Sequence, residues 1–304
     1  MKVLNFGSCN IDYVYQLDHV VAPGETEAST GMQIFIGGKG LNQSIAIARA
    51  GTTVYHAGAV GEDGDDLIKL LKDNGANVTF LKKINGKTGQ AIIQVAKSAE
   101  NAIFIYSGAN GSITKQYVDE VLEHFTAGDL ILLQNEITNV DYIVEKAFER
   151  GMTIAFNPSP INEEIAKIDF NKITYLLVNQ EEAKAISGED DELKALDYFK
   201  VNYPDAKIIL TLGKVGSVYQ DKQQRYFQPS FKVVAVDTTG AGDTFTGYFI
   251  SGLVKGFELK KTLRYATCAS AIAVSINGAA PSIPAFAEVE NKIDAFTVNE
   301  EKPF

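Results

Sequence analysis

Short apolar runs rich in β-branched residues alternate with amphipathic helical patterns along most of the chain. Continuously apolar runs predict buried strands, and apolar residues that recur every three or four positions predict helices. The predicted strands span residues 2–6, 53–60, 130–134, 153–156, 175–178 and 207–212. The predicted helices span residues 41–50, 65–74, 115–125 and 140–150. This alternation is typical of an α/β fold with a doubly wound, mostly parallel sheet, whose ligands bind at the carboxyl ends of the strands.

Two segments interrupt this alternation. Residues 88–96 and 102–106 flank a polar turn at 97–101, which predicts a β-hairpin. Residues 11–21 also look like a strand, with aromatic and apolar side chains on alternate positions. We expect the two pieces to form a small β-sheet, drawn from about 11–34 and 88–107, that lies as a lid over the strand ends. The alternative is an additional antiparallel edge of the main sheet.

A glycine-containing run, D-T-T-G-A-G-D-T-F, extends from Asp237 to Phe245. It lies between an apolar stretch at 232–236, predicted to be a strand, and a long apolar helical pattern. Gly240 and Gly242 are therefore expected at a helix N-terminus. The first N–H groups of a helix lack partners and its dipole is positive there, so the run suits an anion such as a phosphate.

Asp243 falls in the first turn of this predicted helix, where an aspartate either stabilises the helix or serves the site. A second glycine cluster, G-G-K-G-L-N-Q from Gly37 to Gln43, also opens a predicted helix. Its glycines would let a ligand approach the backbone, while Lys39 and Asn42 supply a charge and an amide. Each cluster alone is a weak signal, but the pair indicates a phosphate site.

The common phosphate-binding motifs are absent. The nearest match to a P-loop, at 86–88, has Leu81 where the first glycine belongs. A dinucleotide fingerprint would follow the first strand, but the chain has G-S-C-N-I-D at 7–12. This argues against a nicotinamide-dependent oxidoreductase. Asn10 and Asp12 could instead bind sugar hydroxyls, or they could cap a turn.

Composition narrows the functional classes. The 304 residues carry 28 Lys and Arg against 38 Asp and Glu, giving a net charge of -10. With no basic block, neither nucleic acid nor a membrane surface is an expected partner. No window approaches the length of a membrane span, and no signal peptide is recognised, so a cytoplasmic protein is expected. Cys9 and Cys268, both within apolar stretches, fit a reducing compartment. The three histidines are scattered and predict no metal site.

The two glycine clusters together resemble the signatures of the ribokinase (PfkB) family of carbohydrate kinases. The resemblance covers essentially the whole chain, and the order of its motifs also agrees. The supporting motifs are Gly7–Asp12, Gly108-Ala109-Asn110, Glu136, Asn157-Pro158-Ser159-Pro160, Asn179-x-x-Glu182, Thr211-Leu212-Gly213-x-x-Gly216 and Gly278-x-x-Pro281-Ser282. The resemblance implies a ribokinase-like kinase domain over residues 1–304.

The resemblance also implies roles for individual residues. Asp243 would be the catalytic base, beside an anion hole formed by the N–H groups of Gly240, Ala241, Gly242 and Asp243. The sugar would be held by Asn10, Asp12, Gly38, Lys39, Asn42, Glu136 and Asp243. ATP and Mg²⁺ would be held by Asn179, Glu182, Thr211, Gly213, Gly216 and Gly242. A monovalent cation, K⁺, would be caged by oxygens of Asp237, Thr239, Ala273, Ile276, Gly278 and Ser282.

The implied reaction is ATP-dependent transfer of the γ-phosphate to a primary hydroxyl of a small sugar, with D-ribose as the first expectation. Leu41, Ser44 and the Gln134-Asn135-Glu136 run depart from the pattern of ribose kinases, so the sugar stays open. The alternatives are a kinase of fructose, 2-keto-3-deoxygluconate or a nucleoside, and a non-catalytic sugar-binding protein. The family also leads us to expect a homodimer that associates through the lid sheets.

Overall fold

A large sheet forms the centre of the protein in the computed structural model, which describes residues 1–98 and 100–300. Its strand order within these residues is β13 (Arg225–Pro229), β12 (Gly216–Gln220), β11 (Lys207–Thr211), β10 (Tyr175–Asn179), β9 (Thr153–Asn157), β8 (Leu130–Gln134), β1 (Val3–Phe6), β4 (Val54–Val60) and β5 (Asn77–Lys83). The strands from β11 to β5 pair in parallel, whereas β12 and β13 pair antiparallel at one edge. The predicted doubly wound, mostly parallel sheet is confirmed.

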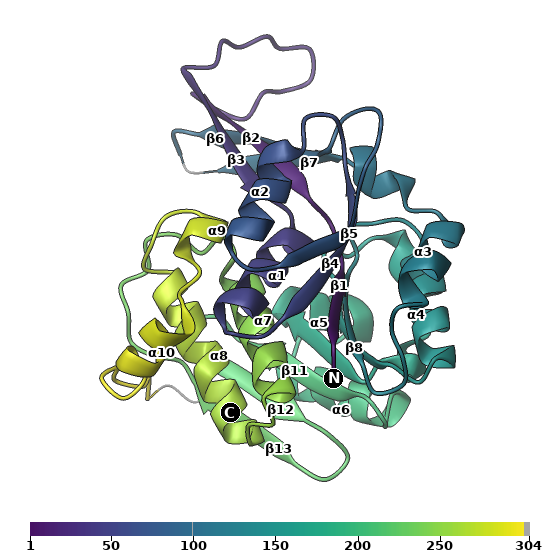
Figure 1. The fold of residues 1–304 in the computed structure, drawn as a ribbon. Helices are drawn as coiled ribbons and strands as arrows, with labels where there is room; N and C mark the ends of the chain where they lie inside the picture. Colours follow the sequence, from purple (N-terminus) through teal and green to yellow (C-terminus); the bar gives the residue numbers. More distant parts are fainter. Residues whose placement is uncertain (99, 301–304) are drawn as a thin grey trace.

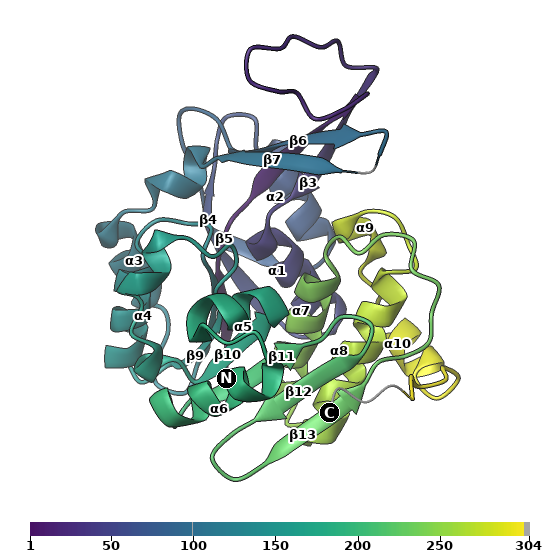
Figure 2. The ribbon, with the colours of Figure 1, turned by 180° about the vertical axis from the view of Figure 1, so that it is seen from behind.

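Helices cover both faces of this sheet (Figures 1 and 2). One core contains side chains from α3 (Lys115–Leu122), α4 (Val140–Glu149), α5 (Gln180–Ser187) and α6 (Glu192–Asn202). The other core contains side chains from α1 (Lys39–Arg49), α2 (Asp65–Asp73), α7 (Ala241–Val254), α8 (Leu259–Ala273), α9 (Ala279–Ser282) and α10 (Phe286–Lys292). The central strands are buried on both faces, which explains their continuously apolar sequences.

A separate small sheet stands beyond the carboxyl end of β1, at the end of the molecule toward which the parallel strands run (Figures 1 and 2). Its order is β3 (Gly31–Gly37), β2 (Asn10–Leu17), β6 (Gly89–Ala96) and β7 (Asn101–Tyr106). The predicted hairpin is formed by β6 and β7, and β2 pairs in parallel with β6. Because these strands share no ladder with the main sheet, the alternative of an additional edge is wrong. Strand β3 continues to Gly37, past the expected limit at residue 34.

Polar residues occupy the carboxyl ends of neighbouring strands on one side of β1, the strand at which the strand order reverses. Asn157, Asn179 and Thr211 end β9, β10 and β11, and Glu136 follows β8 shortly after Gln134. Strands β4 and β8 lie on opposite sides of β1, so loops diverge on either side of it and leave a crevice. The topology therefore places the candidate residues at the usual ligand-binding position of this sheet type.

The helices α1 and α7 pack closely against each other above this crevice. A Cβ added at Gly247 of α7 would lie 2.3 Å from the Cβ of Ala46 in α1, so only glycine allows this approach. Phe245 and Phe249 stack along α7 with their ring centroids 6.4 Å apart, and the long apolar helix predicted after the glycine run is confirmed. The two glycine clusters thus open helices that lie side by side.

The prediction of a strand at residues 232–236 is wrong. Lys232 N donates to Thr297 O and Val236 N to Val274 O, two segments that belong to no sheet, and Val234 is 84% exposed. The valines favour an extended backbone, but the segment pairs with no strand of the main sheet, and its backbone bonds go to the loops that follow α10 and α8.

Two further expectations from the sequence concern the cysteines and membrane-spanning segments. Cys9 and Cys268 are both buried and free, as expected. Among the residues that the structure describes, no helix has the length and apolar character needed to cross a membrane.

Candidate active site

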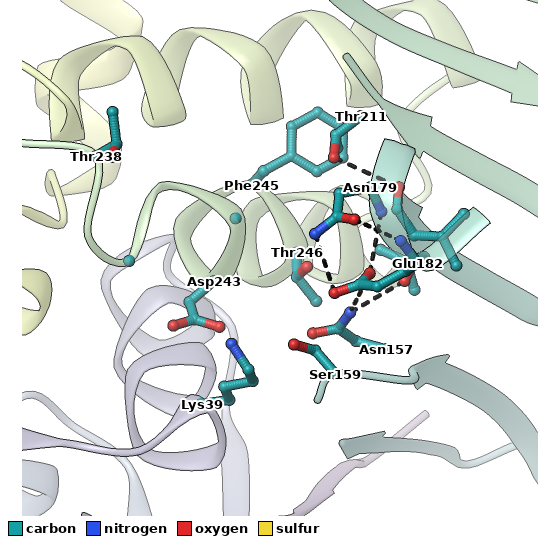
Figure 3. Close-up of a pocket in the computed structure, with 14 residues that line it drawn as sticks. Lys39, Asn157, Ser159, Asn179, Glu182, Thr211, Thr238, Asp243, Phe245 and Thr246 are labelled. Carbon is teal, nitrogen blue, oxygen red and sulfur yellow. Dashed lines mark hydrogen bonds between the residues drawn. The ribbon is translucent and has the colours of Figure 1, made fainter. Parts of the chain in front are cut away.

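A cavity of about 230 Å³ opens between the N-termini of α7 and α5 and the carboxyl ends of the strands (Figure 3). Its lining includes seven of the residues singled out from the sequence: Lys39, Asn179, Glu182, Thr211, Gly240, Gly242 and Asp243. These residues are separated by up to 204 positions in the chain. The structure therefore brings both glycine clusters and the Asn179-x-x-Glu182 motif to one cavity.

The N-terminus of α7 presents unpaired N–H groups to this cavity. Gly240 caps the helix with φ +73°, a left-handed conformation that favours glycine. Ala241 N donates to Thr238 O, but among the described residues Gly242 N and Asp243 N have no main-chain partner. The turn thus has the geometry of an anion site, as its sequence predicted.

The carboxylate of Asp243 is buried and held on both oxygens. Asn42 Nδ2 donates to Oδ2 at 3.0 Å, and Gln43 Nε2 donates to Oδ1 at 2.9 Å. Both donors lie in the first turn and a half of α1. The helix that begins in the Gly37–Gln43 cluster therefore holds the aspartate of the Asp237–Phe245 run by two hydrogen bonds. A residue that served only as a helix cap would bond to the N–H groups of its own helix, which Asp243 does not do.

Asn179 and Glu182 form a reciprocal capping box at the start of α5. Asn179 Oδ1 accepts from Glu182 N at 2.8 Å, and Glu182 Oε2 accepts from Asn179 N at 3.0 Å. Glu182 is nevertheless only 6% exposed, whereas glutamates that only cap a helix are mostly exposed. Burial raises the pKa of Glu182, and the hydrogen bond from Asn179 opposes this.

Lys39 lies next to Asp243 in the cavity (Figure 3), and four carboxylates act on its charge. Burial alone would lower the pKa of its ammonium, but Asp243, Glu136, Glu182 and Asp12 together raise it. Such a charge in a buried setting is tolerated because acids surround it. Lys39 therefore links the side of the site that holds Asp12 and Glu136 to the cavity at α7.

Glu136 and Asp12 occupy the side of the site nearest the small sheet. Glu136 Oε2 accepts from Lys39 N at 3.0 Å and from Ser8 Oγ, so it braces the glycine cluster. Burial raises the pKa of Glu136, which Lys39 opposes. Burial also raises the pKa of Asp12, to about 6, with a further contribution from Glu136. A Cβ at Gly37 would lie 2.2 Å from Asp12 Oδ2, so the carboxylate rests directly on this glycine.

A second cavity, of about 260 Å³, lies between the small sheet and the loops after β8 and β9. Asn10 and Glu136 line it together with Ile105 of β7. Asn10 Oδ1 accepts from Asn110 Nδ2 at 2.7 Å, which fixes the side chain at the edge of this space. Gly38 precedes α1 with φ +97°, and its added Cβ would collide with Asn10 N at 2.9 Å.

The residues expected around a monovalent cation lie on two loops that touch each other. Asp237 Oδ2 accepts from Gly278 N at 2.8 Å, and Oδ1 accepts from Thr239 N at 2.9 Å. Burial opposes ionisation of Asp237, but the hydrogen bonds from Thr239 and Gly278 hold its pKa below the usual range. The rest of the set follows nearby in the chain: Ala273 at the end of α8, Ile276 in the loop, and Ser282 at the end of α9.

Some predicted residues lie outside these cavities, and some lining residues had no predicted role. Gly213 and Gly216 lie in the turn between β11 and β12, next to Thr211 but not in the cavity lining. Gln43 and Asn157 are contacts whose roles the sequence did not predict. Their positions could have indicated a role in the site, because Gln43 belongs to the second glycine cluster and Asn157 ends a parallel strand.

Comparisons with known proteins agree with this geometry. The family model described as "pfkB family carbohydrate kinase" matches residues 1–285, and the chain belongs to this family. A curated ribokinase from Bacillus subtilis is 35% identical over 289 residues, covering 93% of this chain and 96% of its own. A curated ribokinase from Schizosaccharomyces pombe is 33% identical and covers 97% and 98%.

Solved structures agree as well. A ribokinase from Thermotoga maritima has a TM-score of 0.84 at 34% identity and covers 96% of this chain and 99% of its own. An Arabidopsis thaliana ribokinase complexed with ribose and ATP has a TM-score of 0.84 at 25% identity and covers 96% and 98%. The ribokinase-like fold is therefore shown.

The raised pKa of Asp12 predicts that this residue destabilises the folded protein at neutral pH. A folded-state pKa of about 6 lies above that of an unfolded aspartate, so the contribution is favourable at low pH and is lost as pH rises through about 6. Asp12→Asn should raise the free energy of unfolding at pH 7.5 by about 1–2 kcal/mol, and the gain should shrink toward zero near pH 4.

Urea unfolding at pH 7.5, 5.5 and 4 measures this difference. Asp18→Asn is the matched control, because Asp18 is exposed and bonds Lys97, and its pKa is lowered. That substitution should produce no gain at pH 7.5. A destabilised Asp12→Asn at pH 7.5 would contradict the electrostatic account.

Proposed function

We propose that the protein is an ATP-dependent kinase that transfers the γ-phosphate to the primary hydroxyl of a small sugar, with D-ribose as its substrate. The observation that carries the proposal is the buried Asp243 carboxylate, held by Asn42 and Gln43 beside the unpaired N–H groups of its own helix turn. Family membership and the ribokinases of similar sequence support it.

The sugar would lie between the small sheet and α1, where hydroxyl-binding groups converge. Asn10 and Glu136 supply amide and carboxylate oxygens in the second cavity, and Asp12, against Gly37, would supply a further carboxylate; Gly38 lets the start of α1 approach Asn10. Asn42 Oδ1 is buried and has no hydrogen-bond partner among the described residues, so it is an acceptor suited to a sugar O–H. Ile105 of β7 would close over the sugar from the small sheet, which acts as a lid that excludes water.

Asp243 would act as the base. As the sugar oxygen attacks the γ-phosphorus, Asp243 takes the hydroxyl proton; the new O–P bond forms, and the bond to the bridging oxygen of ADP breaks. The N–H groups at the start of α7, from Gly240 to Asp243, would stabilise charge on the transferred group. Phosphoryl transfer has a loose transition state, so positioning and charge stabilisation supply most of the catalysis and a weak base suffices.

The α7–α5 cavity would receive the phosphates of ATP, with Thr211 at the edge where the nucleotide continues toward the β11–β12 turn. Gly213 and Gly216 would let the nucleotide lie against that turn. The residues present fit Mg²⁺ bound with the phosphates, because Glu182 supplies a buried carboxylate and Asn179 an amide in the same cavity. Bound Mg²⁺ would neutralise phosphate charge, and Lys39 would add to this.

The reaction predicts ADP release with ribose and its loss in Asp243→Asn. A coupled assay over ribose, fructose, 2-keto-3-deoxygluconate and nucleosides should give the highest kcat/KM with ribose. Asp243→Asn should lower kcat about 10²–10⁴-fold, the usual contribution of a general base. Asp294→Asn, at the surface pair with Arg264, is the control and should retain full activity.

5-Deoxyribose tests which hydroxyl is phosphorylated, and it should inhibit without being turned over. Turnover of another sugar but not of ribose would contradict the substrate. Full activity in Asp243→Asn would contradict the mechanism, and no turnover with any acceptor would favour a non-catalytic sugar-binding protein.

We also propose that K⁺ binds at the two touching loops around Asp237. The expected ligands are carboxylate, carbonyl and hydroxyl oxygens, the hard donors that an alkali ion prefers. Both oxygens of Asp237 already accept hydrogen bonds, but a carboxylate has about four acceptor positions, so a cation can share them. The loops adjoin Gly240, whose added Cβ would lie 3.0 Å from Ala279, so cation binding would order the anion site.

Replacing KCl by choline chloride at equal ionic strength should lower kcat several-fold, and Asp237→Asn should remove the response. The matched control is Asp221→Asn, a turn aspartate that accepts from Gln223 N and Gln224 N far from the cavities. Equal rates in both salts would contradict a K⁺ site, as would an unchanged K⁺ response in Asp237→Asn.

We further propose a homodimer formed through the small sheets. Apolar side chains on β3 and β7 are about half-exposed: Met32, Ile34, Phe35, Ile103, Phe104, Ile105 and Tyr106. So many apolar side chains on one small sheet are unusual for a free surface. A second copy of the same sheet would cover those that lie on one face symmetrically.

Sedimentation velocity should show a dimer at micromolar concentration. Ile103→Lys and Phe104→Lys, neighbours on β7 with opposite faces, should identify the buried face, because only one should dissociate the dimer fully. Val201→Lys, at an exposed valine of α6, is the control and should stay dimeric. A monomeric wild type would contradict the proposal.

A further inference from the structure

Gln43 is a fully buried residue that neither a sugar nor a nucleotide would need to touch, yet it contacts the proposed base. Its Nε2 donates to Asp243 Oδ1 at 2.9 Å and to Asn157 Oδ1 at 3.2 Å. Its Oε1 accepts from Gln134 Nε2 at 2.6 Å. Both N–H donors and one of the two acceptor positions of this buried amide group are therefore used.

The orientation of this amide is set by a chain of hydrogen bonds that begins at a main-chain carbonyl. Asn5 Nδ2 donates to Gly40 O at 2.7 Å, and a carbonyl oxygen can only accept, so Asn5 must turn its NH₂ toward it. Asn5 Oδ1 then accepts from Gln134 Nε2 at 3.0 Å. Since Gln134 Nε2 also faces Gln43 Oε1, Gln43 must present its NH₂ group to Asp243.

A second carbonyl sets the same direction from the opposite side. Asn157 Nδ2 donates to Leu177 O at 3.1 Å, so Asn157 turns its oxygen toward Gln43. Asn157 Nδ2 also lies 3.4 Å from Glu182 Oε2. The chain thus joins Asp243 on α7 to Glu182 on α5 through Gln43 and Asn157. Two independent anchors leave only one orientation in which all these bonds form.

The chain also extends away from the site to a neutral histidine. Asn5 Nδ2 donates to Ser44 Oγ at 2.7 Å, and Ser44 Oγ lies 2.8 Å from His56 Nδ1. Burial lowers the pKa of His56 to about 3, so the ring is neutral and Nδ1 can accept the serine proton. The far end of the chain therefore holds no charge that could compete with Asp243 for the N–H groups.

We infer that Gln43 is a positioning residue, which aims the Asp243 carboxylate at the sugar hydroxyl through an amide chain oriented by Gly40 O and Leu177 O. Gln134 and Asn5 act through Gln43. The inference rests on the proposed function, because it needs Asp243 to act as the base. Asn42 holds the other carboxylate oxygen, and with Gln43 it leaves the carboxylate no free rotation about its last bond.

The test replaces the buried amides by methionine, which is close in volume and cannot donate. Gln43→Met should lower kcat about 10–100-fold, a typical effect of misplacing a reacting group. Ribose affinity by calorimetry and KM for ATP should stay within about threefold. Gln134→Met should lower kcat less, because Gln43 remains but loses its orientation. The double variant should be no slower than Gln43→Met alone, since both changes break one chain.

Gln220→Met is the matched control, a buried glutamine that donates to Leu196 O on the far part of the sheet. It should change the melting temperature without changing kcat. A twofold or smaller change in kcat for Gln43→Met would overturn the inference, as would a loss of ribose affinity that equals the loss of kcat. If the double variant lowered kcat by the product of the two single effects, the two residues would act independently, and the proposed hydrogen-bond chain would be contradicted. Absence of turnover in the wild type would instead refute the proposed function.

Discussion

The packing of α1 against α7 is the contact on which the site depends. Gly247 and Ala46 bring the two backbones together, and this closeness lets Asn42 and Gln43 reach Asp243 from the neighbouring helix. Each helix begins with a glycine cluster, so the contact also brings the two clusters to one place. A wider separation would leave Asp243 buried without partners for its carboxylate, which is costly in the interior.

Charge at the centre of the site follows from this packing. Lys39 lies among acids from four different elements or loops, and those acids raise its pKa despite burial. The acids themselves resist ionisation where burial dominates, as at Asp12 and Glu136. Such a group stores unfavourable electrostatic energy in the free protein. Ligands that donate hydrogen bonds to the acids and bring phosphate to Lys39 would lower this energy. The unfavourable electrostatic energy of the free site therefore favours ligand binding.

Sequence predicted the repeating strands and helices well because buried parallel strands and amphipathic helices leave strong periodic signals. The stretch at 232–236 was misjudged for a reason that periodicity cannot reveal. Valines favour an extended backbone, but a strand also needs a partner strand, and the backbone of this stretch bonds to loop residues instead. Strands β12 and β13 at the antiparallel edge were not predicted either. The role of Glu182 was predicted only from the family resemblance, since a glutamate at a helix start is usually exposed, whereas this one is buried. Cytoplasmic location stays a prediction from the sequence.

The hydrogen-bond chain through Gln43 shows why part of a site is not visible in sequence. The four amides that carry it, Asn5, Gln43, Gln134 and Asn157, come from β1, α1, β8 and β9 and are far apart in the chain, and none of their side chains titrates or is a nucleophile. Their effect depends on how each amide group is oriented. A Gln43 with its oxygen toward Asp243 would place a lone pair against the carboxylate instead of donating a hydrogen bond to it. Only the three-dimensional positions of two carbonyl oxygens, Gly40 O and Leu177 O, decide between these orientations. The backbone of the fold therefore sets the polarity of the chain that ends at the proposed base.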